Sequence, residues 1–135
     1  EHPNALAPGK RPYHTIIPAM ATVDGELYLC YGVMGAFFQP QGHLQVISNL
    51  VDFGMDPQQA INALRFMVFE DSVFLEEGLA TEVVRELQSR GHRVSVVSGY
   101  PRVGMGGAQV IQRDRETGIL WGGSEPRKDG CALGW

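Results

Sequence analysis

Gly32, Gly35 and Gly42 lie in the stretch YGVMGAFFQPQGH, residues 31–43, where an apolar strand is predicted to end and a helix to begin. Backbone N–H groups at such a turn can bind an anion or the developing oxyanion of an acyl-transfer reaction. The spacing matches neither a dinucleotide fingerprint, which needs a third glycine, nor a Walker loop, which needs Gly-Lys-Ser/Thr. On shape alone, an oxyanion site and an ordinary tight turn both remain open.

His14 and Thr15 form a second polar pair, which follows the basic segment Lys10-Arg11-Pro12 at the start of a predicted strand. An imidazole can act as a general base, and a hydroxyl can donate a hydrogen bond to a substrate. A lone His beside a Thr also fits a purely structural role, so both interpretations stand.

The segment SEPRKDG, residues 124–130, alternates charges around Pro126. Such a pattern is typical of a solvated turn. Alternatively, Glu125 pairs with Arg127 or Asp129 and fixes the C-terminal tail.

Metal chemistry has little support in this sequence. The other histidines have no partner at ligand spacing, and the two cysteines are too far apart to form a metal-binding pair; these residues are His2, His43, His92, Cys30 and Cys131. We predict no metal site and no cofactor, and we expect Cys30 to be a small core residue of its strand.

The elements that must position these residues follow from apolar periodicity and turn signals. A hairpin turn is predicted at Asp24-Gly25, and Asp56, Pro57 and Gln59 predict a capped helix start. The predicted strands are 15–23, 27–33, 92–98, 108–112 and 117–122, the helices are 41–53, 57–65 and 79–90, and 66–74 is extended. This order predicts an α+β fold, with helices covering an antiparallel sheet.

Length and charge predict a single domain and argue against a nucleic-acid-binding or membrane-spanning protein. The chain has 135 residues, the size of one domain, with a net charge of −4 and only 19% charged residues. Scattered Lys and Arg argue against nucleic acid, and no apolar run is long enough to span a membrane. No signal-peptide pattern is present, so the compartment stays unassigned. We expect residues 1–13 to form an irregular loop and residues 123–135 to form a tail that docks through Leu133 and Trp135.

Five segments together resemble the C-terminal part of the small subunit of γ-glutamyltranspeptidases. They follow the family's order over nearly the whole chain: APGKRPYHTIIPAM, GVMGAFFQPQGH, DFGMDPQQAINALRF, the helix-to-strand junction GHRV, and GGSEPRKDGCALGW. The resemblance implies an N-terminal-nucleophile (Ntn) hydrolase with a four-layer αββα sandwich, of which residues 1–135 form a single partial domain.

The resemblance also implies a reaction. In this family a precursor cuts itself before a Thr, whose hydroxyl then attacks the γ-glutamyl amide of a small molecule such as glutathione, with its own α-amine as base. The acyl-enzyme passes to water or to an acceptor amine. Residue 1 is Glu, so the nucleophile is expected in the upstream part of the small subunit. That upstream part and the large subunit are the expected partners.

Carried over to this chain, the family's oxyanion donors fall on the backbone N–H groups of Gly35 and Ala36, and its substrate-binding hydroxyl pair falls on His14 and Thr15. Well-known members have Gly-Gly and Ser-Ser at these places. Ala adopts positive φ less readily than Gly, and His alters the contact to a substrate carboxylate.

Three functional hypotheses follow. The chain is part of a γ-glutamyl transferase or hydrolase, part of a related Ntn acylase acting on another amide, or a non-catalytic fragment or binding module that keeps only the scaffold. His14 in place of Ser slightly favours the acylase hypothesis.

Overall fold

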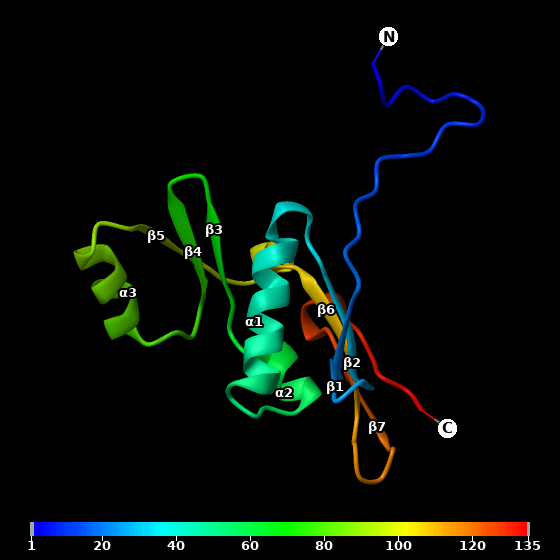
Figure 1. Cartoon of the computed structure of the whole chain (residues 1–135). Helices are drawn as coiled ribbons and strands as arrows, with labels where there is room; N and C mark the ends of the chain where they lie inside the picture. Colours follow the sequence, from blue (N-terminus) through cyan, green and yellow to red (C-terminus); the bar gives the residue numbers. More distant parts are fainter. Residues whose placement is uncertain (1, 135) are drawn as a thin grey trace.

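The structure, a computed structural model, describes residues 2–134 and divides them between two sheets with helices between and beside them (Figure 1). The strands are β1 Ala19–Val23, β2 Glu26–Met34, β3 Phe66–Phe69, β4 Ser72–Glu76, β5 Arg93–Val97, β6 Gly107–Arg113 and β7 Leu120–Ser124. The α-helices are α1 Gln39–Val51, α2 Pro57–Asn62 and α3 Thr81–Ser89, and the 3-10 helices are η1 Ala36–Phe38, η2 Tyr100–Met105 and η3 Pro126–Lys128.

The larger sheet is antiparallel, in the order β1-β2-β6-β7, and its inner face packs on α1 and α2. The core lies between this face and the two helices; its buried side chains are Leu29, Val33, Phe38, Val46, Leu50, Ala60, Ile61, Ala108 and Val110. Helix α1 contributes Val46 and Leu50 to this core, and α2 contributes Ala60 and Ile61.

The outer face of the same sheet is apolar and largely exposed, although residues 131–133 lie along part of it beside Gly122. Met20, Cys30 and Ile111 lie opposite one another across β1, β2 and β6, and Leu120 is on the same face of β7. Met20 is 72% exposed and Leu120 is 63% exposed. Cys30 is half-buried on this face, with a free thiol, so its predicted place in the core is wrong.

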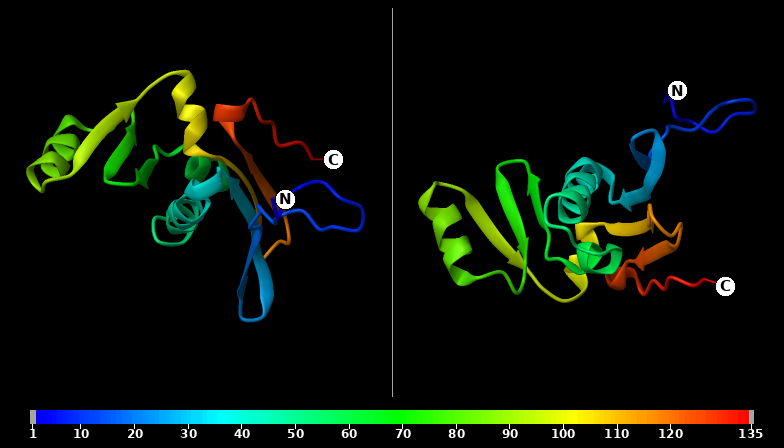
Figure 2. Two further views of the ribbon diagram at one scale, coloured as in Figure 1. Left: turned by 90° about the horizontal axis from the view of Figure 1, so that it is seen from above. Right: turned by 60° about the horizontal axis from the view of Figure 1, so that its bottom comes forward.

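The smaller sheet has the order β3-β4-β5 and corrects the expectation of a wholly antiparallel arrangement. Strands β3 and β4 form an antiparallel hairpin that turns at Glu70-Asp71, but β4 and β5 are parallel. Parallel neighbours need a crossover connection, and α3 provides it. The α+β class is confirmed. The views in Figures 1 and 2 agree that α1 and α2 lie between the two sheets, with α3 beside β5.

Local signals fixed several element boundaries. The capping box at the start of α2 is confirmed, since the Gln59 N–H donates to Asp56 Oδ1 at 2.8 Å and the Asp56 N–H donates to Gln59 Oε1 at 3.2 Å. Strand β1 begins only at Ala19, directly after Pro18, which cannot donate to a ladder. Helix α1 begins at Gln39, two residues before the prediction, with Pro40 in its first turn.

The two ends of the described chain differ. Residues 2–17 form no helix or strand, are exposed and extend away from the body of the protein (Figure 1). The C-terminal segment is buried at Ser124 and Glu125, whereas Leu133 is 85% exposed. Trp135 lies outside the described residues, so the docking of the last residues stays a prediction.

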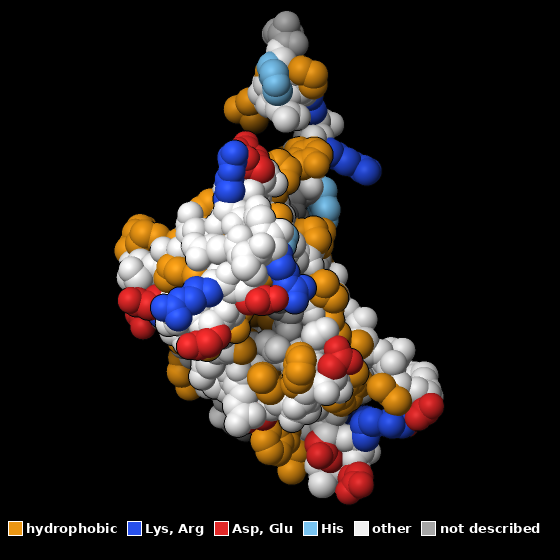
Figure 3. Space-filling model, turned by 90° about the vertical axis from the view of Figure 1, so that its left-hand side faces the viewer, with side chains coloured by type: hydrophobic (Ala, Val, Ile, Leu, Met, Phe, Trp, Pro, Cys, Tyr) orange, Lys and Arg blue, Asp and Glu red, His pale blue; other side chains and the backbone are white. Residues whose placement is uncertain are grey.

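Charges on the surface are mixed in sign. The face that carries the smaller sheet shows acidic and basic side chains interspersed (Figure 3). Exposed pairs there include Glu86–Arg90 in α3 and Asp71–Arg93 at the β3–β4 turn. Among the helices of residues 2–134, none combines the length and the apolar character that a membrane span requires.

Candidate active site

The turn Gly35–Ala36 joins β2 to η1 and α1 through an unusual backbone. Gly35 has φ 147° and Ala36 has φ 50°. The left-handed region costs a residue with a Cβ about 1–2 kcal/mol, so Ala36 is strained where Gly would not be. Such strain persists only when the surrounding structure imposes it, and it is concentrated at functional sites.

The N–H groups of this turn are available as donors. Within residues 2–134, neither the Gly35 N–H nor the Ala36 N–H takes part in a hydrogen bond, whereas the Gly35 carbonyl accepts from the Phe38 N–H at 3.0 Å. The two donors are adjacent in the chain and precede α1, whose N-terminal end carries partial positive charge. Chemically, the turn offers two neutral donors to a negatively charged oxygen.

A surface hollow of about 250 Å³ opens beside the turn. Its lining is mainly apolar and comes from the turn, α1 and β3: Gly35, Ala36, Phe37, Phe38, Gln41, Met67, Val68 and Phe69. Phe37 is 84% exposed at its rim. A reacting acyl group at the turn would therefore have apolar side chains on one side.

Two glutamines of α1 hold the smaller sheet against the turn. The Gln41 amide donates to the Val68 carbonyl at 2.8 Å and accepts from the Val68 N–H at 2.7 Å. Gln45, one helical turn later, makes the same pair of bonds to Phe66, at 2.9 and 3.0 Å. The i, i+4 spacing in the helix matches the i, i+2 spacing in the strand, so these amides occupy the edge of β3 as a neighbouring strand would.

His14 and Thr15 are not brought to the turn. Both are exposed in the irregular N-terminal segment and make no hydrogen bond within residues 2–134. The residues that follow them, Ile16 to Pro18, line a hollow that Met34 also lines, one residue before Gly35. The substrate-binding role of His14 and Thr15 stays a prediction.

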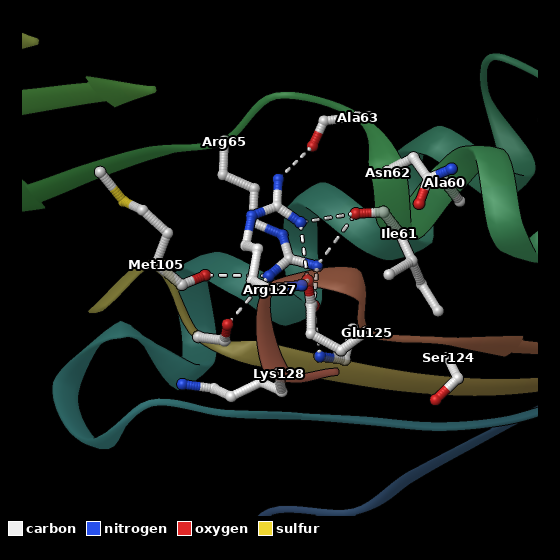
Figure 4. Close-up of polar contacts among 12 residues, drawn as sticks. Ala60, Ile61, Asn62, Ala63, Arg65, Met105, Ser124, Glu125, Arg127 and Lys128 are labelled. Atoms are coloured by element: carbon white, nitrogen blue, oxygen red, sulfur yellow. Dashed lines mark hydrogen bonds and ion pairs between the residues drawn. The ribbon is translucent and has the colours of Figure 1, made fainter. Parts of the chain in front are cut away.

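Next to the turn lies a buried cluster of charged side chains that sequence reasoning largely missed. Arg65, Glu76 and Glu125 are each no more than 2% exposed, and the Arg127 side chain is 4% exposed. Arg65 Nη2 donates to Glu125 Oε2 at 2.8 Å, and Arg127 Nη1 donates to Glu125 Oε1 at 2.8 Å. Figure 4 shows both guanidinium groups beside Glu125. We call these four residues the ion-pair cluster.

Glu76 completes the ion-pair cluster from the end of β4. Its carboxylate accepts from Arg127 Nε at 2.6 Å and from Arg127 Nη2, a bidentate pairing. It also accepts from the Arg65 N–H at 2.9 Å and from Arg102 Nε at 3.1 Å. Thus α2, β4, η2 and η3 are tied together at one point.

The environment keeps the cluster ionised. Burial alone would raise the pKa of Glu125, but hydrogen bonds from Arg127 and the Ala108 N–H and the charge of Arg65 lower that pKa below its ordinary value. For Glu76 too, burial acts to raise the pKa, while bonds from Arg127, the Arg65 N–H and Arg102 outweigh it and lower the pKa. Burial lowers the pKa of Arg65, and the negative charge of Glu125 opposes that shift.

Part of this cluster was visible in the sequence. The ion pair of Glu125 with Arg127 is confirmed, and the solvated-turn interpretation of this segment is wrong at these two residues, because both side chains are buried. Arg65 and Glu76 carried only a weak signal: Arg65 stands between Leu64 and Phe66, and Glu76 ends the apolar run Val73-Phe74-Leu75. A charge inside an apolar run needs a buried partner.

Metal ligands do not gather anywhere in residues 2–134, where no group of three or more His, Cys, Asp or Glu side chains could hold an ion. His43, in α1, instead bonds through Nδ1 to the Gln39 carbonyl at 2.8 Å and packs on the Tyr31 ring.

Comparisons with known proteins converge on one family. The family model described as gamma-glutamyltranspeptidase matches residues 1–135. The glutathione hydrolase-like YwrD proenzyme of Bacillus subtilis is 40% identical over 98% of this chain and 26% of its own length. The oxamate amidohydrolase proenzyme of Klebsiella pneumoniae is 33% identical over all of this chain and 26% of its own length.

A solved structure gives the same result. The cephalosporin acylase of Bacillus halodurans is 44% identical, with a TM-score of 0.85 over 97% of this chain and 24% of that chain. The chain therefore spans about a quarter of the length of these relatives. Their names describe three different amide substrates, so the scaffold alone does not define the substrate.

Proposed function

Because this chain belongs to the γ-glutamyltranspeptidase family, we propose that the complete protein is an Ntn hydrolase that transfers or hydrolyses the acyl group of γ-glutamyl amides such as glutathione. The observation that carries the proposal is the strained turn Gly35–Ala36, with two N–H donors unused within residues 2–134. The resemblance carries the family's oxyanion donors over to this turn.

In the proposed mechanism, the hydroxyl of an N-terminal Thr outside this chain attacks the amide carbonyl, and the α-amine of that Thr takes the proton. The carbonyl oxygen becomes an oxyanion, to which the Gly35 and Ala36 N–H groups donate. The protonated α-amine then gives its proton to the leaving amine, and the acyl-enzyme is resolved by water or by an acceptor amine. Each such donor contributes about 10²–10³ in kcat.

The partners in this proposal are the large subunit and the upstream part of the small subunit. The largely exposed apolar face of the larger sheet supports it, since Met20, Ile111 and Leu120 there are 72%, 49% and 63% exposed. An apolar sheet face of this kind packs on a second sheet in layered folds. The four-layer αββα sandwich would be completed in this way, with residues 1–135 as one partial domain.

A related acylase is the second candidate. The relatives include a cephalosporin acylase at 44% identity, the hollow beside the turn is mainly apolar, and the resemblance aligns His14 with a Ser of well-known family members. A non-catalytic scaffold is less well supported, because the relatives named above carry the names of hydrolases and acylases.

The decisive experiment compares two substrates on the purified full-length protein. γ-Glutamyl-p-nitroanilide and glutaryl-p-nitroanilide differ only in the α-amino group. A γ-glutamyl enzyme has a kcat/KM at least 100-fold higher for the first, and an acylase cleaves the second equally well or better. N-terminal sequencing of the processed chains tests the Thr nucleophile. If the processed protein cleaves neither anilide within hours, both proposals are overturned.

The turn itself is tested by replacing Ala36 with lactic acid, which exchanges the N–H for an oxygen and leaves the methyl group in place. We expect kcat to fall by about 10²–10³ with KM nearly unchanged. The same exchange at Ala80, at the start of α3, is the matched control. Equal rates for the two esters would contradict the oxyanion role.

A further inference from the structure

We propose that Arg65 is a positioning residue for the Gly35–Ala36 turn and that it acts through the backbone of Met105 and Gly106. The inference rests on the proposed function, because it concerns the same oxyanion turn. Arg65 is 2% exposed and touches neither Gly35 nor Ala36 through a hydrogen bond, so its effect must be transmitted.

The first step is the hydrogen bonding of Arg65 to the segment before β6. Arg65 Nη1 donates to the Met105 carbonyl at 2.9 Å and to the Gly106 carbonyl at 3.4 Å. Met105 is itself 2% exposed. One nitrogen thus holds two successive carbonyls of this segment, and Figure 4 shows the guanidinium of Arg65 beside Met105.

The second step is the contact between this segment and the turn. A Cβ on Gly35 would lie 3.1 Å from Gly106 Cα, so the two backbones touch. A Cβ on Gly106, which has φ 78°, would lie 2.6 Å from the Met34 carbonyl oxygen and 2.8 Å from Phe38 Cδ1. The position of Gly106 therefore determines where the residues on both sides of Gly35 can lie.

The third step is the rigidity of Arg65. Its other terminal nitrogen, Nη2, donates to Glu125 at 2.8 Å and to the Ile61 carbonyl at 3.3 Å. Glu125 Oε2 also accepts from the Ala108 N–H at 2.8 Å, two residues beyond Gly106. The planar guanidinium holds both sides at once, which a lysine ammonium on a flexible stem cannot do.

The test is Arg65→Lys in the full-length protein, which keeps the charge beside Glu125 and removes the fork. We expect kcat to fall about 10- to 100-fold with KM changed less than twofold, because a displacement of about 1 Å at a catalytic group has effects of this size. The rate is taken per active site, by titration of the acyl-enzyme. Arg90→Lys is the matched control, since Arg90 is 68% exposed and pairs with Glu86.

Hydrogen exchange gives a second readout. In Arg65→Lys, exchange is expected to rise in peptides that cover residues 34–37 and 105–108 and to stay unchanged in α3. If this variant does not fold, Lys128→Met replaces it: the exposed Lys128 donates to the Val103 carbonyl at 2.8 Å and steadies the same segment. There we expect about a threefold fall in kcat.

The outcomes separate the two proposals. A kcat within twofold of wild type, in a folded variant with unchanged exchange, overturns the positioning role of Arg65. If the lactic acid exchange at Ala36 leaves the rate unchanged, the oxyanion role fails instead. An equal loss of rate in the Arg90→Lys control would also overturn the inference.

Discussion

Replacing Glu125 by Gln tests the ion-pair cluster most directly. Glu125 Oε2 accepts from Arg65 Nη2 and the Ala108 N–H, and Oε1 accepts from Arg127 Nη1 and the Arg127 N–H. A glutamine has one acceptor oxygen and one NH₂ group. In either orientation, the NH₂ group faces two donors, and a negative charge is lost between two buried guanidinium groups.

The expected cost follows from this geometry. Removing one partner of a buried ion pair destabilises a protein by about 3–5 kcal/mol, because the remaining charge stays buried without compensation. The unfolding midpoint in urea falls by this free energy divided by the m value of the full-length protein. Glu125→Asp keeps the charge but shortens the side chain, so an intermediate loss is expected.

The assay is urea unfolding of the full-length protein at pH 7, followed by circular dichroism. The matched control is Glu86→Gln, since Glu86 is 60% exposed and pairs with Arg90 at i, i+4. Such pairs contribute at most about 0.5 kcal/mol. A midpoint shift for Glu125→Gln no larger than that of the control would refute the reasoning that the cluster depends on each of its carboxylates.

Three further predictions use the same unfolding midpoint. Ala36→Gly relieves the strain at φ 50° and should stabilise the protein by about 0.5–1 kcal/mol after the entropy cost of Gly; a loss of stability would contradict the strain. The pKa values of Glu76 and Glu125 are lowered in the folded state. Their ionised forms therefore contribute fully to the free energy of unfolding above the unfolded-state pKa of about 4.3, and this contribution is lost as the pH falls below that value. The unfolding midpoint should stay constant from about pH 8 to 6 and fall below about pH 4.5. In Glu125→Gln this fall should be shallower, and a pH profile equal to that of the wild type would contradict the prediction. Gly123→Ala places a Cβ 2.7 Å from the Pro57 carbonyl and should cost about 1–3 kcal/mol, whereas Gly104→Ala, with open space around it, should cost much less.

Local chemistry made most of the fold predictable. Asp24-Gly25 set the first hairpin and Asp56 with Gln59 set the start of α2, because each signal acts within four residues. The parallel pairing of β4 with β5 was not predictable in this way, since it depends on where α3 returns the chain. The hairpin formed by β3 and β4 was not predicted, because 66–74 was expected to be one extended segment; the chain turns at Glu70-Asp71, where Glu70 has φ 54°.

The same distinction between local and distant contacts decides which parts of the candidate site were predictable. The Gly35–Ala36 turn was visible because its residues are contiguous, whereas the ion-pair cluster joins Arg65 to Glu125 across 60 positions and Glu76 to Arg127 across 51. Sequence spacing carries no information about such pairs. Only the Glu125–Arg127 pair, two residues apart, could be named in advance.

Ala36 departs from the family's Gly-Gly pattern, and its strained backbone supports a turn that is held by its neighbours. From sequence, Ala in place of Gly put the geometry of the oxyanion turn in question, because Ala disfavours positive φ. The structure nevertheless holds Ala36 at φ 50°, so neighbouring contacts must outweigh about 1–2 kcal/mol of strain. Those contacts lead from Gly35 to Gly106 and, through Arg65, to Glu125.

A strained residue and a buried ion-pair cluster each lower stability when taken alone. Here both act on the same stretch of backbone, the meeting point of residues 35–36 and 105–106. Such local conflicts are expected where a structure must hold one geometry for function. Gly at position 36 and apolar side chains at positions 65 and 125 would remove both costs. The coincidence therefore favours a fixed pair of N–H donors over a simple chain reversal.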